Sequence, residues 1–277
     1  MTPDVAIVTI SYNSAAVYAK YWKSFLDATS LDVIIVDNAS VDGSGRQLST
    51  SFPDQQIIQL DRNIGYGRAA NVGLKQCQSS FALLLNPDLY ISEEAVASLV
   101  DAAISDKDNS AIWAPAVTQK DCSRISSVTV DAVCGAAMLF DLEKMKSIGL
   151  FDENIFLYSE ETDLCYRTRS AGYSIKLFPD IFIEHIIDGS SGHHPSLDYM
   201  KSWHFGWSRC YYLGKHSLFS PKYNPQRMYR SYKIKSFLSL TSLKRLRYRG
   251  QAAGVRAYSR GEKAFTADGL PQQYVVD

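Results

Sequence analysis

The sequence predicts an α/β fold in which helices flank a mostly parallel central sheet, and three observations favour this class. Four short apolar runs, at residues 5–10, 33–37, 57–60 and 81–85, have the length and composition of strands. Stretches with helical character lie between them, which is the alternation of βαβ units. Two of the runs end in acidic tips, at Asp37 and Asp88, and the carboxyl ends of parallel strands meet at one edge of a sheet.

The run at residues 81–85 is the strand around which we expect the fold to be built. It is apolar throughout and stops at Asn86, Pro87 and Asp88, which is typical of a central parallel strand that is covered on both faces. Asp88 would then lie where an oxygen ligand can hold a divalent cation against a diphosphate. On these residues alone, an Asn-Pro-Asp turn with solvated side chains is the alternative.

Apolar periodicity and turn residues predict the remaining elements. We expect helices at residues 15–26, 46–51 and 93–103, a glycine-bearing loop that enters a helix within 62–77, and further strands at 111–117, 133–140, 174–178 and 181–185. Ser92 is a plausible N-cap for the helix at 93–103, because Glu93 and Glu94 follow it.

Length and composition exclude several classes of protein. A chain of 277 residues can form one large domain, or one with an appendage. Its five cysteines include no CxxC pair, which indicates a reducing, cytoplasmic setting. The N-terminus lacks a basic segment followed by a long apolar one, and no later stretch approaches 18 uncharged apolar residues. We therefore expect neither a signal peptide nor a membrane span.

The net charge of zero conceals a basic C-terminal segment. Residues 222–263 carry many Lys and Arg side chains, and Glu262 is their only acid. No zinc-finger spacing or RNA-binding signature accompanies them, so we expect no nucleic-acid partner. Apolar residues such as Phe237, Leu240 and Leu246 are interspersed with the basic ones. This pattern fits an interfacial helix on an acidic membrane surface, and a merely solvated cationic face is the alternative.

Residues 149–173 combine an aromatic and acidic loop with a helix that ends at Gly172. Glu161 begins the more apolar helical face, whereas Glu160 and Asp163 share the neighbouring face with Arg167. Partial burial would raise the pKa of Glu161, which suits a general base. The alternative is that all three acids simply stabilise the helix N-terminus through its dipole.

Two later features each allow two interpretations. His185, at the end of the last strand, is either a structural residue or a ligand, and His193 and His194 lack zinc-site spacing, so we treat them as loop residues. The aromatic segment that begins near Tyr199 carries Trp203, Trp207 and Tyr211 at helical spacing. These aromatics form either a helix core or a platform for a sugar.

Seven segments together resemble the family 2 inverting glycosyltransferases, which have the GT-A fold with its Rossmann-like sheet. The segments are VTISYNS (8–14), IIVDNASVDGS (34–44), RNIGYGRAANVG (62–73), LLLNPDLYI (83–91), VCGAAMLFD (133–141), FDENIFLYSEETDLCYRTRSAGY (151–173) and the strand that ends at His185. Their order and spacing make the resemblance specific. The NPD form and the aromatic loop look most like the rhamnosyltransferase-type members, which use dTDP-L-rhamnose to build bacterial surface polysaccharides.

The resemblance implies a role for each matching residue. The residues that it places at the nucleotide-sugar are Thr9, Tyr12, Asp37, Asn63, Gly65, Asn71 and Asn86. It makes Asp88 a ligand of Mg²⁺ or Mn²⁺, together with His185, and Glu161 the general base. Asn86 replaces the first acid of the family's DxD element, so one charge is missing. The base is usually Asp, and Glu is longer by one methylene, so Glu160 and Asp163 remain alternative bases.

These implications give an expected activity and organisation. We expect a GT-A domain at residues 1–200 and a helical, basic region at 201–277 on the acceptor side. The expected reaction is inverting, metal-dependent transfer of L-rhamnose from dTDP-L-rhamnose to a lipid-linked saccharide, by a cytoplasmic protein in peripheral contact with the inner membrane surface. The alternatives are a donor such as a UDP-hexose or UDP-N-acetylhexosamine, and a nucleotide-sugar-binding protein without catalysis.

Overall fold

The computed structural model describes residues 4–186 and 195–273, so His193 and His194 lie outside the described residues. The described chain divides into two compact units. Unit 1 contains residues 4–62, 69–151 and 161–186, and unit 2 contains residues 63–68, 152–160 and 195–273. The predicted domain division between residues 200 and 201 stays a prediction.

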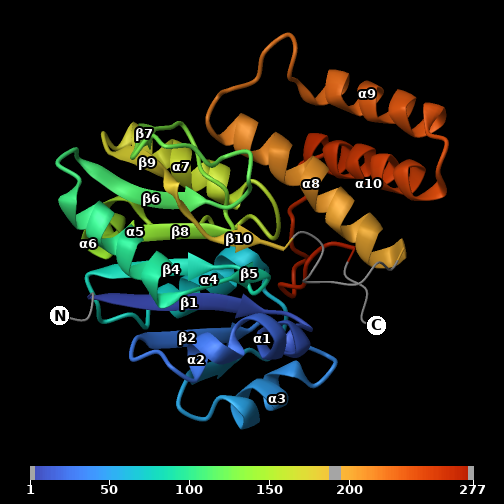
Figure 1. Ribbon diagram of the computed structural model, residues 1–277. Coiled ribbons are helices and arrows are strands. Elements are labelled where there is room, and N and C mark those ends of the chain that lie inside the picture. Colours follow the sequence, from blue (N-terminus) through green and yellow to red (C-terminus); the bar gives the residue numbers. More distant parts are fainter. Residues whose placement is uncertain (1–3, 187–194, 274–277) are drawn as a thin grey trace. The chain divides into compact units, whose positions relative to one another are not determined.

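The described residues form strands and helices in alternation through unit 1 and helices alone at the C-terminal end (Figure 1). The strands are β1 (Val5–Ser11), β2 (Asp32–Asp37), β3 (Gln56–Gln59), β4 (Phe81–Leu85), β5 (Leu89–Tyr90), β6 (Ser110–Ala116), β7 (Val128–Thr129), β8 (Ala137–Asp141), β9 (Ser174–Phe182) and β10 (Glu184–His185). The helices are α1 (Ala15–Tyr21), α2 (Lys23–Leu26), α3 (Ser44–Ser51), α4 (Tyr66–Leu74), α5 (Glu93–Ser105), α6 (Leu142–Ile148), α7 (Glu160–Ser170), α8 (Pro195–Lys215), α9 (Pro225–Leu238) and α10 (Ser242–Ser259).

Unit 1 is built on an eight-stranded sheet with the order β3-β2-β1-β4-β8-β6-β9-β7. Strands β1 to β4 are parallel, β6 is parallel to β9, and β8 is antiparallel to both of its neighbours. Strands β5 and β10 form a separate antiparallel pair. The predicted α/β class with a mostly parallel sheet is confirmed.

Apolar residues cover both faces of the central strands, as the composition of β4 predicts. One face presents residues such as Ile7, Ile35 and Leu83 to a core that includes α1, α2 and α5. The opposite face lies against α4, where Gly73 approaches Val8 closely. Alternate residues of a strand point to opposite faces, so strands buried on both sides read as continuous apolar runs.

The structure differs from the predicted elements in three places near the carboxyl edge of the sheet. The helix expected at residues 15–26 is two helices, which are separated at Trp22. The strand expected at 133–140 begins only at Ala137, because residues 133–136 form a turn beside the end of β4. Finally, β4 has a parallel neighbour on one side and the antiparallel β8 on the other, so it is central without being wholly parallel.

Unit 2 is organised around the contact of α8 with α10, which also packs against α9. Trp203 and Trp207 are 3 % exposed, so the core interpretation of these aromatics holds and the sugar-platform interpretation does not apply to them. The helices approach so closely that a Cβ at Gly254 would lie 1.9 Å from the backbone oxygen of Trp203. In the described part of the chain, no helix combines the length and apolar character needed to span a membrane.

Candidate active site

The candidate site begins where β1, β2 and β4 end at one edge of the sheet. The register pairs Ser11 with Asp37 and Thr9 with Leu85, so the segments after all three strands leave the sheet at the same level. The chain passes from β1 to β2 on one side and returns to β4 on the other. Such a reversal of strand order opens a crevice beyond the carboxyl ends, where α/β proteins bind ligands.

Asp37 is held by the turn that follows β2. Its carboxylate accepts two hydrogen bonds from Ser40, one from the hydroxyl and one from the backbone nitrogen, which lies 3.1 Å from Oδ2. The Ser40 hydroxyl in turn accepts from the backbone nitrogen of Asn13 at 2.8 Å, which ties this turn to the loop after β1. The half-buried Tyr12 lies in that loop. The two predicted nucleotide-binding segments are therefore joined directly.

The turn of Asn86, Pro87 and Asp88 is anchored at both ends. The indole nitrogen of Trp22 donates to the backbone oxygen of Pro87 at 2.8 Å, and the backbone nitrogen of Asn86 donates to Ala136 at 2.8 Å. Asp88 is 4 % exposed. The turn is thus a fixed part of the sheet edge, which disfavours the alternative of an Asn-Pro-Asp turn with freely solvated side chains.

Asp88 and His185 face one another. The short pairing of β5 with β10 brings His185 back to the end of β4, where its Nε2 lies 3.2 Å from Oδ1 of Asp88. Adjacent ligands of an octahedral cation with bonds of about 2.1 Å lie about 3 Å apart, so the two atoms fit one shared ion. A carboxylate oxygen with an imidazole nitrogen suits Mn²⁺, and a carboxylate oxygen also suits Mg²⁺.

These two side chains cannot enclose a cation by themselves. Across residues 4–186 and 195–273, no cluster of three or more His, Cys, Asp or Glu side chains is arranged to hold a metal. An octahedral ion at Asp88 and His185 would need its other ligands from a diphosphate and from water. The donor set therefore fits a cation that is bound together with a nucleotide.

Sequence reasoning missed Tyr18, which connects the acidic residues of the site. Its hydroxyl lies 2.8 Å from Oγ1 of Thr9. Burial raises the pKa of Tyr18, and the carboxylates of Asp37 and Asp88 raise it further, so both carboxylates lie within electrostatic range of one phenol. The signal in the sequence is the spacing of four residues between Tyr18 and Trp22, which puts both aromatics on the buried face of the first helical segment.

Glu161 stands in the first turn of α7, half-buried as its helical face predicts. Burial raises the pKa of its carboxyl group, which confirms the predicted direction. Its Cβ would lie 3.4 Å from a Cβ at Gly135, the residue beside the Ala136 oxygen that holds Asn86. Gly135 therefore lies against Glu161, and the neighbouring Ala136 holds the turn that leads to Asp88.

The thiol of Cys134 provides a second link between these carboxylates. Partial desolvation raises the pKa of this thiol, and the negative charges of Glu161 and Asp88 also raise it. Both carboxylates thus act on the same sulfur. Glu161 and Asp88 therefore lie within electrostatic range of one thiol, and their roles as base and metal ligand stay predictions.

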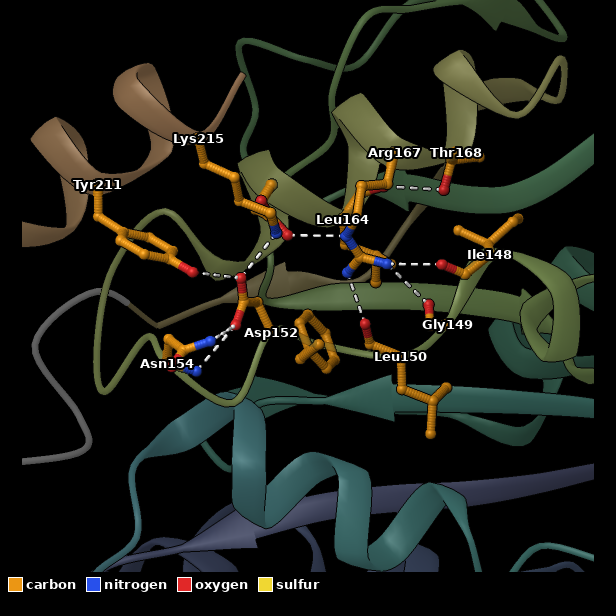
Figure 2. Close-up of polar contacts among 12 residues, drawn as sticks. Ile148, Gly149, Leu150, Asp152, Asn154, Leu164, Arg167, Thr168, Tyr211 and Lys215 are labelled. Carbon is orange, nitrogen blue, oxygen red and sulfur yellow. Dashed lines mark hydrogen bonds and ion pairs between the residues drawn. The ribbon is translucent and has the colours of Figure 1, made fainter. Parts of the chain in front are cut away.

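Asp163 has a structural environment that differs from that of Glu161. It is fully buried, and its Oδ2 accepts from Nε of Arg167 at 2.8 Å. The same guanidinium donates to three backbone oxygens, those of Ile148, Gly149 and Leu150 (Figure 2). Asp163 therefore anchors α7 to the preceding segment. Glu160, also buried, belongs to unit 2.

Three of the predicted nucleotide-binding residues hold the backbone. The carboxamide of Asn71 donates to the oxygen of Phe151 and accepts from its nitrogen, each at 2.9 Å. In unit 2, Asn63 accepts from the backbone nitrogen of Gly65 at 3.0 Å. Gly65 has φ +89, and a Cβ there would lie 2.4 Å from the Phe156 oxygen. The roles of these residues in nucleotide binding stay predictions, whereas their contacts with the backbone are seen in the structure.

Asp152 begins the segment of unit 2 that precedes α7. Its carboxylate accepts from both nitrogens of Asn154, from the hydroxyl of Tyr211 at 3.0 Å and from Nζ of Lys215 at 2.6 Å (Figure 2). Partial burial opposes ionisation, but Lys215 and Asn154 outweigh it and lower the pKa of Asp152 to about 2. Within unit 2, this carboxylate holds the loop to α8.

The sheet topology and the acidic carboxyl edge agree with the α/β fold of the glycosyltransferases that the sequence resembles. The sequence model of the protein family described as glycosyl transferase family 2 matches residues 6–155. The chain belongs to this family. This match begins in β1 and includes Asp37 and Asp88, but it ends before Glu161 and His185.

Comparisons with known proteins agree with the family. The chain is 23 % identical over 247 residues to an N-acetylglucosaminyl-diphospho-decaprenol L-rhamnosyltransferase of Mycobacterium tuberculosis, with 71 % of this chain and 80 % of the relative covered. It is 22 % identical over 219 residues to the dTDP-rhamnosyl transferase RfbF of Shigella flexneri, which covers 69 % of this chain and 72 % of the relative.

A solved structure shares the fold. The mannosyltransferase PcManGT from Pyrobaculum calidifontis, solved in complex with GDP-Man and Mn²⁺, superposes with a TM-score of 0.59 at 14 % identity. The superposition covers 97 % of this chain and 78 % of the mannosyltransferase. At this identity the likeness shows the fold alone.

Proposed function

We propose that the chain transfers L-rhamnose from dTDP-L-rhamnose to a saccharide on a lipid carrier, with inversion at the anomeric carbon. The observation that carries the reaction type is the placing of Glu161 and Asp88 around residues 134–136. The donor and the acceptor class are supported by the two relatives named as rhamnosyltransferases, one of which acts on a decaprenol-linked saccharide according to its name.

In the proposed reaction, a hydroxyl oxygen of the acceptor forms a bond to the anomeric carbon as the bond to the diphosphate oxygen breaks. Glu161 accepts the proton of the hydroxyl, and the electron pair of the broken bond leaves with the diphosphate. The raised pKa of Glu161 makes its carboxylate a stronger proton acceptor than an exposed one. Direct displacement from the opposite face inverts the anomeric configuration.

Asp88 and His185 would hold Mg²⁺ or Mn²⁺ beside the diphosphate. The cation supplies Lewis-acid stabilisation of the charge that develops on the leaving group. Asn86, which replaces an acid, leaves this end of the sheet with one negative charge fewer, so we propose that the cation binds with the nucleotide rather than before it.

Asp37 and Tyr12 are the proposed nucleotide contacts in unit 1, whereas the fully buried Thr9 supports the site through its hydrogen bond with Tyr18. Each carboxylate oxygen of Asp37 accepts one hydrogen bond from Ser40. A carboxylate oxygen can accept a second one, for example from the N3–H group of thymine. The same arrangement would accept uracil, which has the same N3–H. The residues therefore support a pyrimidine nucleotide more strongly than they support one particular sugar.

A donor screen tests this function. The purified chain is incubated with dTDP-L-rhamnose, UDP-glucose or UDP-N-acetylglucosamine, a diphospholipid-linked saccharide and Mg²⁺ or Mn²⁺, and release of the nucleoside diphosphate is measured. We expect release with dTDP-L-rhamnose that requires both acceptor and metal, and a product of inverted anomeric configuration by NMR. Transfer from a UDP-sugar alone would assign a different donor, and nucleotide binding without any transfer would contradict the enzymatic proposal.

A further inference from the structure

The turn between α9 and α10 displays large apolar side chains to solvent. Phe237 is 86 % exposed, Leu238 67 % and Leu240 98 %. Ile234 on α9 and Leu243 on α10 extend the same surface. We call these five residues the apolar tip. Exposed apolar side chains are ordinary when scattered, but a contiguous group at one turn marks a surface that another phase or molecule covers.

The apolar tip belongs to a regular part of unit 2. The opposite face of α9 buries Met228, Tyr232 and Ser236, so Ile234, Phe237 and Leu238 lie on the outward face. The hydroxyl of Thr241 accepts from the backbone nitrogen of Lys244 and caps α10 at the turn. The exposure therefore results from the way the two helices pack, as the hairpin they form in Figure 1 illustrates.

Basic side chains surround the apolar tip on both helices. The exposed cations nearest in sequence are Arg230, Lys233, Lys235, Lys244 and Arg245. Residues 225–249 contain no Asp or Glu, so no acid on these two helices neutralises them. Among the described residues, Arg247 pairs with Asp198 of α8 at 2.9 Å. Lys235 lies over the rings of Tyr232 and Tyr248, and Arg245 donates to the backbone oxygen of Ser239, so both are held at the hairpin by uncharged groups.

We propose that the apolar tip inserts into the surface of an anionic membrane while the surrounding cations bind lipid headgroups. Apolar residues at the centre and basic residues around them match the acyl and headgroup layers of a bilayer in order of depth. A nucleic acid would neutralise the cations but would leave Leu238 and Leu240 exposed to water. A purely apolar protein partner would bury Lys235 and Lys244 without a counter-charge.

The inference rests on the proposed lipid-linked acceptor for its purpose, since such an acceptor is presented at a membrane surface. Its test is independent of that function, because the vesicles carry no saccharide. Sedimentation with vesicles of phosphatidylglycerol and phosphatidylcholine measures binding, and pure phosphatidylcholine vesicles provide the uncharged reference. We expect binding to the anionic vesicles that weakens as salt concentration rises.

Variants assign the binding surface. Phe237→Ser and Leu240→Ser should each lower the vesicle partition coefficient about tenfold, and the charge reversals Lys233→Glu and Lys244→Glu should abolish the preference for anionic lipid. The matched controls are Ile104→Ser, at a side chain that is 60 % exposed on α5, and Lys107→Glu near it. These controls should bind vesicles like the wild type. Circular dichroism and thermal unfolding check that every variant is folded.

Insertion is tested separately from surface attraction. The four native tryptophans, Trp22, Trp113, Trp203 and Trp207, are all buried, so a tryptophan placed at residue 240 by Leu240→Trp reports a new environment. On addition of anionic vesicles its emission should shift to shorter wavelength, and lipids brominated on the acyl chains should quench it. Ile104→Trp should show neither effect.

Three outcomes would overturn the inference. One is equal vesicle binding by the wild type and by Phe237→Ser and Leu240→Ser. Another is a salt-independent affinity for neutral vesicles that equals the affinity for anionic ones. The third is a wild-type dimer in analytical ultracentrifugation that Leu240→Ser makes monomeric while vesicle binding is absent, which would assign the apolar tip to a second copy of the chain.

Discussion

Glu161 and Asp163 are two residues apart on one helix, and the structure gives them opposite properties. Asp163 is fully buried against a guanidinium, whereas Glu161 is half-buried and its pKa is raised by burial. A base must exchange its proton with a substrate, so an inaccessible carboxylate in an ion pair is poorly suited. The ion pair therefore disfavours Asp163 as the base, and the choice between Glu160 and Glu161 stays a prediction.

Replacing Glu161 tests its role directly. Glu161→Gln should lower kcat by about 100- to 10,000-fold with little change in donor KM, because the amide cannot accept the proton. The wild-type rate should rise with pH through a pKa above the ordinary value of about 4.3, and the variant should lose this limb. Steady-state release of the nucleoside diphosphate between pH 4 and 9 measures both effects. Glu143→Gln, at an exposed carboxylate paired with Lys146, is the control, and a fully active Glu161→Gln would exclude this base.

His185 provides the corresponding test of the metal site. His185→Ala should raise the metal concentration for half-maximal activity by at least about tenfold, because Asp88 then remains as a single ligand beside the diphosphate. Titration with Mn²⁺ at saturating donor measures the change. His216→Ala, in the turn just after α8, should titrate like the wild type. A wild-type metal response in His185→Ala would remove His185 from the site.

At the scale of elements, the position of α7 depends on Arg167. This one side chain joins Asp163 to the carbonyls of Ile148, the last residue of α6, and of the two residues that follow it, so it fixes α7 against the end of α6. Gly149, one of the three, has φ +80 and ends α6. The guanidinium thus replaces helix-end partners that the backbone cannot supply.

Removal of this side chain should be costly. Arg167→Ala should lower the free energy of unfolding by about 3 kcal/mol, because it leaves a buried carboxylate without its counter-charge. Arg169→Ala is the matched control, since Arg169 is 38 % exposed and pairs with Asp131, which is 90 % exposed, at 3.3 Å. The control should lose less than about 1 kcal/mol. Urea unfolding followed by circular dichroism compares the two, and equal losses would contradict the anchoring role.

The elements also show how far the sequence could predict the fold. Runs such as 5–10, 33–37 and 81–85 became strands within a residue or two, because continuous apolar character specifies a buried strand. Ser92 caps α5 as predicted, through its hydroxyl and the nitrogen of Ala95. The strand bounds at residues 133–136 were wrong, because the apolar residues there serve a turn whose backbone holds Asn86.

The sequence could predict site residues that stand at strand ends or on one helical face. It could not predict contacts that depend on how distant segments pack together. Asp37 and Asp88 lie at strand ends, and the raised pKa of Glu161 follows from its helical face. The bonds of Tyr18 and Trp22 were not predicted, because helical spacing indicates that both aromatics are buried but does not identify Thr9 and Pro87 as their polar partners. Nor does sequence alone distinguish Asn71 as a clamp on Phe151 from Asn71 as a ligand.

At the scale of the whole molecule, acid sensitivity depends on carboxylates whose pKa values are lowered by folding. Asp152 is one of them, with a pKa of about 2 against an ordinary value of about 3.9. A lowered pKa means that the folded state binds the proton less well than the unfolded state. Its stabilising effect is therefore complete above about pH 4 and declines as pH falls towards 2.

This dependence can be measured with one substitution. Asp152→Asn should lower the Tm at pH 7, because the amide cannot form the ion pair with Lys215. The difference in Tm from the wild type should shrink between pH 4 and pH 2, where the wild-type carboxylate becomes protonated. Asp27→Asn, at a carboxylate that is 52 % exposed and paired with Lys23, is the control and should change little. A difference that stays constant with pH would contradict the assignment.

The contact of α8 with α10 has a consequence for finding relatives of this chain. Gly206, Gly250 and Gly254 stand where the two backbones meet, and a Cβ at any of them would lie 2.8 Å or less from a neighbouring atom. Every other amino acid adds that Cβ, so none of the three glycines can be replaced while the two helices keep this close crossing. Glycines at these three positions should therefore identify relatives in which α8 and α10 cross in the same way, even where the sequences are only about 23 % identical.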